Sequence, residues 1–239
     1  MSATALLVAA RCAGFAFRAP GFSHPSVTPP VRAGLALFLA IAVVPGVSAT
    51  PAAGVEGIGL AAAFVVEFLI GSAIGMAASL VYDGAYAGGR AVDDYVGVKA
   101  IAPSLQLVAP SGFGRVWSLA YTGGFFLTGA YRVTILAFAQ SFERIAPGAV
   151  VGPHAWASFA FGLAGTIVLV GLAVAAPAIG LAFVVQIALG ALSRAVPRFG
   201  SFTLAFPLAF AAALIATALA VPLLAQHAIA PVVALPVVR

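Results

Sequence analysis

Long apolar runs alternate with short polar or proline-rich stretches along most of the chain. The runs lie at residues 3–18, 33–55, 57–82, 117–140, 155–191 and 202–224. Most of them reach the length of about 20 residues that a helix needs to cross a bilayer. Pro177 lies inside the fifth run and predicts a bend there, because proline removes a backbone donor from a helix. The pattern predicts an all-α integral membrane protein of about six hydrophobic helices, several of them kinked or broken.

The composition supports the same class of protein. Of 239 residues, 63% are hydrophobic and 7% are charged, and the mean hydropathy is +1.16. A soluble domain usually carries about a quarter charged residues. We therefore expect residues 1–239 to form a single membrane domain, with no soluble catalytic domain.

The basic residues indicate topology rather than nucleic-acid binding. The formal net charge is +5, but the basic side chains stand singly between apolar runs. Nucleic-acid binding needs a basic patch, so we expect no nucleic-acid partner. The positive-inside rule places both termini outside, because loops carrying Arg18, Arg90 and Arg194 then lie inside. The first run differs from a secretory signal, since Arg11 stands in its middle, and we expect it to be retained.

The sequence offers little that could form a catalytic or metal site. His24, His154 and His227 lie far apart, and the sequence contains no His-Glu-x-x-His pattern. Cys12 is the single cysteine, which excludes an intrachain disulfide and a cysteine metal cluster. We therefore expect no enzymatic activity, no metal and no cofactor.

Two charged side chains interrupt predicted helices. Glu67 lies in the middle of the run at 57–82, and Arg132 lies within the run at 117–140. A charge at the centre of a lone membrane helix costs about 2.5–3.5 kcal/mol, so each should face protein, water or an opposite charge. Three interpretations of Glu67 are open. It could line a polar pathway, it could pair with Arg132, or it could lie at the end of a helix whose boundary differs from that of the run. A secondary transporter of a small solute that uses both residues at mid-membrane is the alternative function, although we find no internal repeat.

Glycine spacing and a charged stretch mark the middle of the chain. Two G-x-x-x-G pairs, Gly71 with Gly75 and Gly84 with Gly88, favour close helix packing. Between residues 83 and 115 the charges become dense. A charged, glycine-containing stretch between two apolar helices is tolerated at membrane depth only where it is buried in protein or lines a water-filled cavity.

Four stretches, taken in order, carry a resemblance to a known family. They are RCAGFAFRAPGF with VTPPVRAGLALFLAIAVVP, EFLIGSAIGMAASLVYDGAYAGGRAVDDYVG, GGFFLTGAYRVTILAFAQSFERIAPG, and LAVAAPAIGLAFVVQIALGALSRAVPRFGSFTLAFPLAF. Their order and spacing resemble the FliR/SpaR/SctT family, the membrane subunit of the type III protein export apparatus of flagella and injectisomes. The resemblance covers residues 10–215.

The resemblance implies a single-copy subunit of an export gate in the bacterial inner membrane. Its partners would be FliP-like, FliQ-like and FlhB-like subunits, surrounding lipid, and unfolded flagellar or effector proteins as the substrate. Residues 1–150 would form a FliP-like helical part and residues 151–239 a FliQ-like helical hairpin. The sequence leaves open whether the machine is a flagellum or an injectisome.

The same resemblance suggests a role for the polar loop at residues 83–115. We expect residues 83–99 to form a bent polar hairpin near the gate entrance. The stretch that follows would reach into the lumen as a plug, since its prolines and glycines disfavour a helix and its apolar side chains could close a pore. An ordinary solvated loop is the competing interpretation. The polar hairpin residues are Asp83, Arg90, Asp93, Asp94 and Lys99, and the plug residues are Leu105, Leu107, Pro110 and Phe113.

Overall fold

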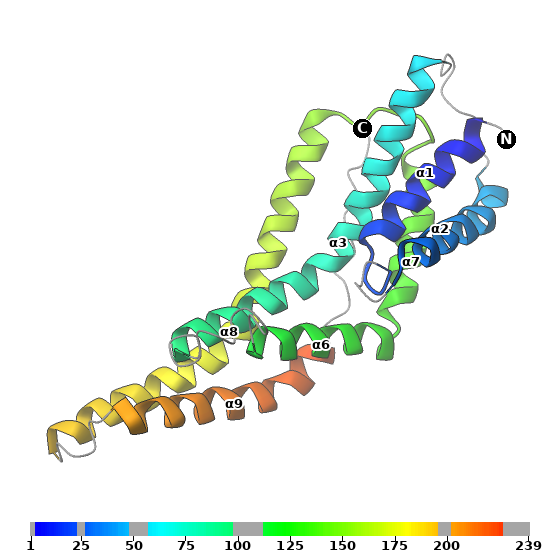
Figure 1. The fold of residues 1–239 in the computed structure, drawn as a ribbon. Helices are drawn as coiled ribbons and strands as arrows, with labels where there is room; N and C mark the ends of the chain where they lie inside the picture. The colour runs from blue at the N-terminus through cyan, green and yellow to red at the C-terminus, as the bar shows by residue number, and fades with distance from the viewer. Residues whose placement is uncertain (1–2, 23–26, 48–56, 98–111, 196–201, 227–239) are drawn as a thin grey trace. The chain divides into compact units, whose positions relative to one another are not determined.

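The computed structural model describes residues 3–22, 27–47, 57–97, 112–195 and 202–226. These residues form α-helices and one short 3₁₀ helix, and they contain no strand (Figure 1). The helices are α1 (Ala3–Arg18), α2 (Pro29–Val43), η1 (Val44–Gly46), α3 (Ile58–Val96), α6 (Gly112–Leu127), α7 (Ala130–Arg144), α8 (Pro153–Ala195) and α9 (Phe202–Gln226). The prediction of an all-α protein is confirmed.

Four helical segments of the described chain are long and apolar enough to cross a membrane. By length and composition they are Pro29–Gly46, Ile58–Val96, Pro153–Ala195 and Ala205–Pro222. The first helix, α1, matches the predicted run, but its 16 residues are fewer than a typical span requires. The described residues therefore form more α-helices, and fewer clear candidate spans, than the predicted six.

The start and end of α2 follow from its prolines. Pro29 stands at the first helical position, where its missing N–H needs no partner. Pro45 and Gly46 fall in η1, so the regular helix stops at Val43 rather than continuing through the predicted range 33–55. Residues 48–56 lie outside the described part of the chain.

The predicted polar loop is wrong over residues 83–96, because α3 continues through them as one 39-residue helix. Asp83, Arg90 and Asp94 are exposed and recur at intervals of seven and four residues, the spacing of one helix face. Gly84 and Gly88 lie on buried positions of the same helix. This stretch is thus a helix with one polar face, and its charges do not require an irregular backbone.

The fourth predicted run is divided into two helices, α6 and α7. Gly129 adopts a positive φ of 76° at the junction, a conformation that favours glycine. Arg132 therefore lies in the first turn of α7 and not in the middle of a span. By contrast, α8 continues through Pro177 as a single helix of 43 residues, which confirms the prediction of one helix there.

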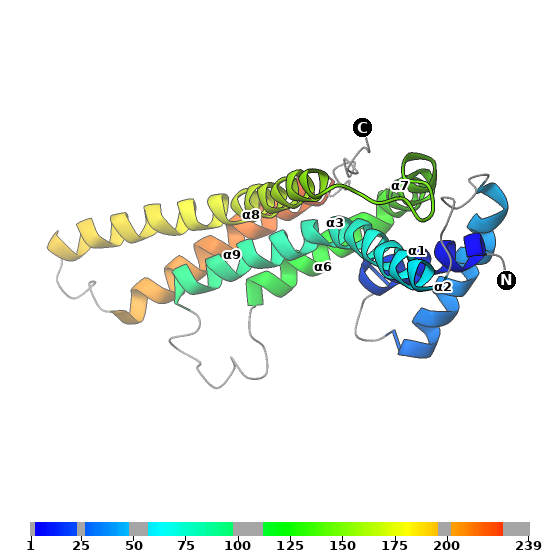
Figure 2. The ribbon, with the colours of Figure 1, turned by 90° about the horizontal axis from the view of Figure 1, so that it is seen from above.

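Two compact units make up the fold, and α3 and α8 each contribute to both. The first unit combines Met1–Leu80 with Gly129–Ala164. In it, α1 lies beside α2 (Figure 2), and the buried core joins α1 to α3 and α7. The core includes Val8, Cys12, Phe15, Ile70, Ile74, Phe138 and Phe142.

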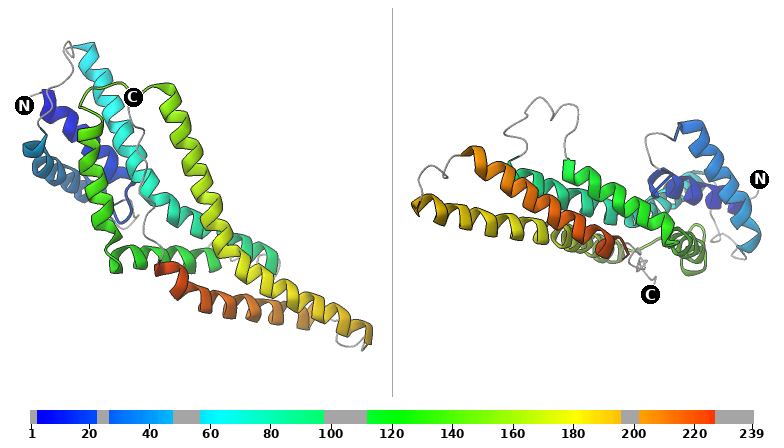
Figure 3. Two further views of the ribbon diagram at one scale, coloured as in Figure 1. Left: turned by 180° about the vertical axis from the view of Figure 1, so that it is seen from behind. Right: turned by 90° about the horizontal axis from the view of Figure 1, so that it is seen from below.

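The second unit combines Val81–Thr128 with Gly165–Ile229. In it, α8 and α9 run side by side as a hairpin, and α6 packs on α9 (Figure 3). The core is built largely of alanines, which let the helices approach closely. Its members include Ala175, Ala178, Ala182, Ala209, Ala213 and Ala216.

Candidate functional site: a buried ion pair

The first unit contains a buried ion pair between Arg11 and Glu67. Arg11 lies on α1 and Glu67 on α3, and both side chains are fully buried. Arg11 donates to both carboxylate oxygens, through Nε to Oε2 and through Nη2 to Oε1, the second at 3.0 Å. This two-pronged geometry is the strongest arrangement that arginine and a carboxylate form.

The remaining donors of Arg11 reach the end of α7. Its Nη1 donates to the carbonyl oxygen of Ser141 at 3.0 Å and to the Ser141 hydroxyl at 3.3 Å. Its Nη2 also donates to the carbonyl oxygen of Ile145 at 3.0 Å. The guanidinium carbon lies 4.4 Å from the centre of the Phe142 ring. These bonds, with the two to Glu67, match the five N–H groups of a guanidinium.

Glu67 has a further partner in the loop after α7. Its Oε1 accepts a hydrogen bond from the Gly148 N–H at 2.8 Å. Gly148 has a φ of 85°, which favours glycine at this position. The pair therefore connects α1, α3 and the C-terminal end of α7, and the Gly148 N–H adds a third hydrogen bond to the carboxylate.

Close backbone contact between α1 and α3 brings the two charges together. A Cβ added at Gly71 would overlap the carbonyl oxygen of Arg11, and one at Gly14 would overlap that of Phe68. At Gly75, an added Cβ would lie 2.7 Å from the Phe15 carbonyl oxygen. The predicted close approach at Gly71 and Gly75 is thus a contact within this chain.

The structure does not form the Glu67–Arg132 pair that the sequence left open. Glu67 is bound to Arg11, and Arg132 is exposed, with its Nε donating to the Tyr131 hydroxyl at 3.1 Å. The signal for the real partner was already present in the sequence, because Arg11 stands in the middle of an apolar helix. Opposite charges on two apolar helices favour pairing, but the sequence did not show which helices touch.

The other predicted site residues fall into two groups. Of the polar residues in α3, Asp83, Arg90 and Asp94 are exposed, whereas Asp93 is buried. Phe113 is buried in the first turn of α6. The remaining predicted residues, Lys99, Leu105, Leu107 and Pro110, lie outside the described residues.

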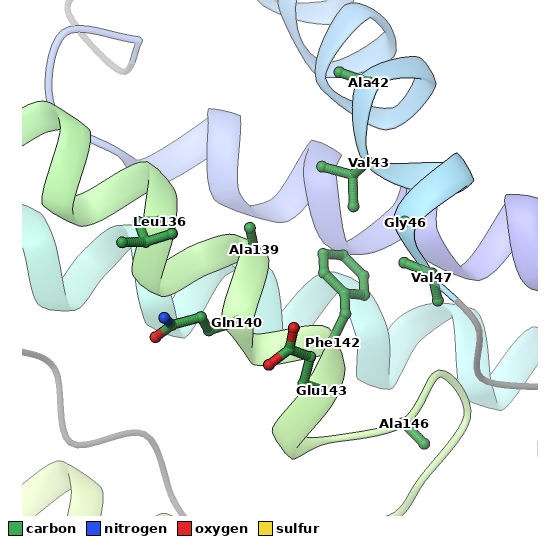
Figure 4. Close-up of a pocket in the computed structure, with 10 residues that line it drawn as sticks. All are labelled: Ala42, Val43, Gly46, Val47, Leu136, Ala139, Gln140, Phe142, Glu143 and Ala146. Carbon is green, nitrogen blue, oxygen red and sulfur yellow. The ribbon is translucent and has the colours of Figure 1, made fainter.

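A groove of about 560 Å³ opens in the first unit between the end of α2 and α7 (Figure 4). Both polar side chains drawn there, Gln140 and Glu143, come from α7. Glu143 is the single acid among the described lining residues, so this groove lacks a pair of groups for acid–base catalysis. Across the described part of the chain, no cluster of three or more His, Cys, Asp or Glu side chains could hold a metal.

The fold and site define an all-α, multi-pass membrane protein in which a buried ion pair connects helices of the first unit. The family described as bacterial export proteins, family 1, matches residues 2–232. The chain therefore belongs to this family, the FliR/SpaR/SctT family, and is a component of a bacterial protein-export apparatus. A search among curated proteins found no match.

Proposed function

We propose that the chain is the single-copy subunit of a type III protein export gate in the bacterial inner membrane. It helps to form and close the channel through which unfolded flagellar or effector proteins cross that membrane. The family match over residues 2–232 carries the proposal. The sequence contains no G-x-x-x-x-G-K-[ST] pattern, so the energy for export comes from other components.

The proposed partners are FliP-like, FliQ-like and FlhB-like subunits. Support comes from the apolar side chains that α8 and α9 leave exposed, because such surfaces need lipid or another protein against them. The α8–α9 hairpin also suits the FliQ-like part proposed for residues 151–239, with the FliP-like part at 1–150. The exposed side chains include Val168, Leu169, Leu172, Phe183, Ile215 and Leu219.

In this proposal the segment between α3 and α6 closes the gate. Leu105, Leu107 and Pro110 belong to it, and its apolar side chains block the lumen without holding a passing chain tightly. The polar face of α3, with Asp83, Arg90 and Asp94 exposed, lies near the entrance to the channel.

Affinity purification in mild detergent from the native host tests the proposed partners. A tagged copy of the chain should co-purify with FliP-like and FliQ-like proteins, identified by mass spectrometry. The matched control is the same tag on an unrelated multi-pass membrane protein. Recovery of the chain without those partners would contradict the proposal.

Removing the segment tests the gate itself. A variant lacking residues 105–111 spares α6, which begins at Gly112. It should let ions leak across the membrane constitutively, while the complex still assembles. An assembled complex that keeps the membrane tight would show that the segment does not close the channel.

A further inference from the structure

The chain leaves α3 and enters α6 at two described points, Gly97 and Gly112. Gly97 has a φ of 84°, and its N–H donates to the carbonyl oxygen of Asp93 at 3.1 Å. This is a common way for a glycine to end a helix. The 14 residues between them, 98–111, lie outside the described part of the chain.

Asp93 connects these two points through its side chain. Its Oδ1 accepts a hydrogen bond from the Phe113 N–H at 3.3 Å, and a Cβ added at Gly112 would lie 3.6 Å from the same oxygen. The first amides of a helix have no partner within the helix, and a negative charge is favourable beside them. The Asp93 side chain is 1% exposed, so this bond is shielded from water.

Two apolar contacts hold the same junction. A Cβ added at Gly89 would lie 2.6 Å from both the Cα and the N of Gly114, so the backbones of α3 and α6 touch there. The Phe113 ring centre lies 5.6 Å from that of Phe210 on α9, and Phe113 is 5% exposed. The start of α6 is therefore anchored in the core of the second unit.

We propose that Asp93 is a positioning residue that holds the start of α6 against the end of α3, and so fixes the positions of Gly97 and Gly112 relative to each other. Its consequence for export rests on the proposed function, in which the segment between them closes the gate. Phe113, which the sequence grouped with the plug, acts here as part of the anchor.

Amide hydrogen exchange in the purified complex tests the contact without reference to transport. In Asp93→Ala, the Phe113 amide should exchange about tenfold faster than in the natural protein, the loss expected for a buried bond to a carboxylate. Ala91→Ser, which changes an exposed position of α3 two residues earlier, should leave the rate unchanged. Exchange in α9 should also stay unchanged, which separates a local opening from general unfolding. An unaltered Phe113 rate in Asp93→Ala would overturn the proposal.

Asp93→Asn covers the case in which the alanine variant fails to assemble. The amide keeps an acceptor oxygen but loses the charge, so the Phe113 amide should exchange roughly threefold faster. A natural rate in Asp93→Asn, together with failed assembly of Asp93→Ala, would assign Asp93 a general role in folding and overturn its positioning role.

Measurements of ion leakage then distinguish the positioning role of Asp93 from the proposed role of the segment in closing the gate. If Asp93 positions the segment, Asp93→Ala should leak as the variant lacking residues 105–111 does, and Ala91→Ser should remain tight. A leaky deletion beside a tight Asp93→Ala would contradict the positioning role and leave the gate in place. A tight deletion variant would contradict the gate, while the exchange rates would still decide the Asp93 contact.

Discussion

Arg11 and Glu67 show how a strongly apolar chain can bury two charges. Taking a charge out of water costs several kcal/mol, and the attraction between the partners repays this only when the remaining hydrogen bonds are also made. Here the guanidinium is surrounded by Glu67, Ser141 and the Ile145 carbonyl oxygen. Because the partners come from α1, α3 and α7, the pair specifies how these helices meet.

Removing the Glu67 charge should destabilise the protein strongly. Glu67→Ala leaves Arg11 buried without its counter-charge, and we expect a loss of about 3–5 kcal/mol in the free energy of unfolding. Chemical denaturation in mild detergent would measure it. Glu143→Gln, an exposed position on α7, is the control and should change the value by less than about 0.5 kcal/mol. The double variant Arg11→Met/Glu67→Leu should recover part of the loss, and a Glu67→Ala protein as stable as the control would contradict the role of the pair.

The accessibility of the Cys12 thiol tests the packing of the same core. Cys12 is fully buried in the apolar core of the first unit. A maleimide should therefore fail to modify the folded protein at neutral pH and should react after denaturation, as read by intact mass. Rapid labelling of the folded protein would show that α1 does not stay packed against its neighbours.

The contact between α1 and α3 depends on glycine rather than on interlocking large side chains. Gly71→Ala should disrupt it, because the added Cβ would overlap the Arg11 carbonyl oxygen and push the ion pair apart. We expect a loss of at least about 2 kcal/mol in the free energy of unfolding. Gly34→Ala on α2 is the matched control, since nothing lies within 4 Å of its added Cβ, and alanine there should be neutral or stabilising. Equal stability of the two variants would rule out a tight α1–α3 contact.

The bounds of the helices could be predicted where the chain carries strong local signals. They could not be predicted as well where contacts between distant residues determine the structure. The run at 3–18 gave the bounds of α1, and Phe202 gave the start of α9. The prediction of a loop at 83–96 is wrong because dense charge does not by itself require an irregular backbone. Asp83, Arg90 and Asp94 recur at helical spacing, so one polar face of α3 accommodates them. The fourth run divides into α6 and α7 at Gly129, which adopts a positive φ. The apolar composition of the run does not reveal this conformation.

The partner of Glu67 could not be derived from one sequence for a related reason. Glu67 and Arg11 are 56 residues apart, and their meeting depends on the glycine contact between α1 and α3. The sequence identified Glu67 as a residue that needs a partner, but the choice between Arg11 and Arg132 required the packing of the helices. The contact between Asp93 and the start of α6 likewise joins residues 20 positions apart across the segment at 98–111.

The orientation of the whole molecule is a prediction of its basic residues. With both termini outside, alkaline phosphatase fused after Arg239 should be active, and phosphatase fused after Ala195, next to Arg194, should be inactive. Green fluorescent protein at the same two positions should give the opposite pattern. Activity of the second phosphatase fusion would reverse the proposed orientation.

Much of the apolar surface of α8 and α9 remains uncovered within this one chain. Lipid and neighbouring subunits both satisfy such a surface, so the helices alone do not give the number of spans in the assembled state. Only the composition of the intact complex can decide between them.

Native mass spectrometry of the complex, purified in mild detergent through a tag on this chain, measures that composition. The export-gate proposal predicts a large assembly with several FliP-like and FliQ-like chains and one copy of this protein. A stable monomer or homodimer without those chains would contradict it.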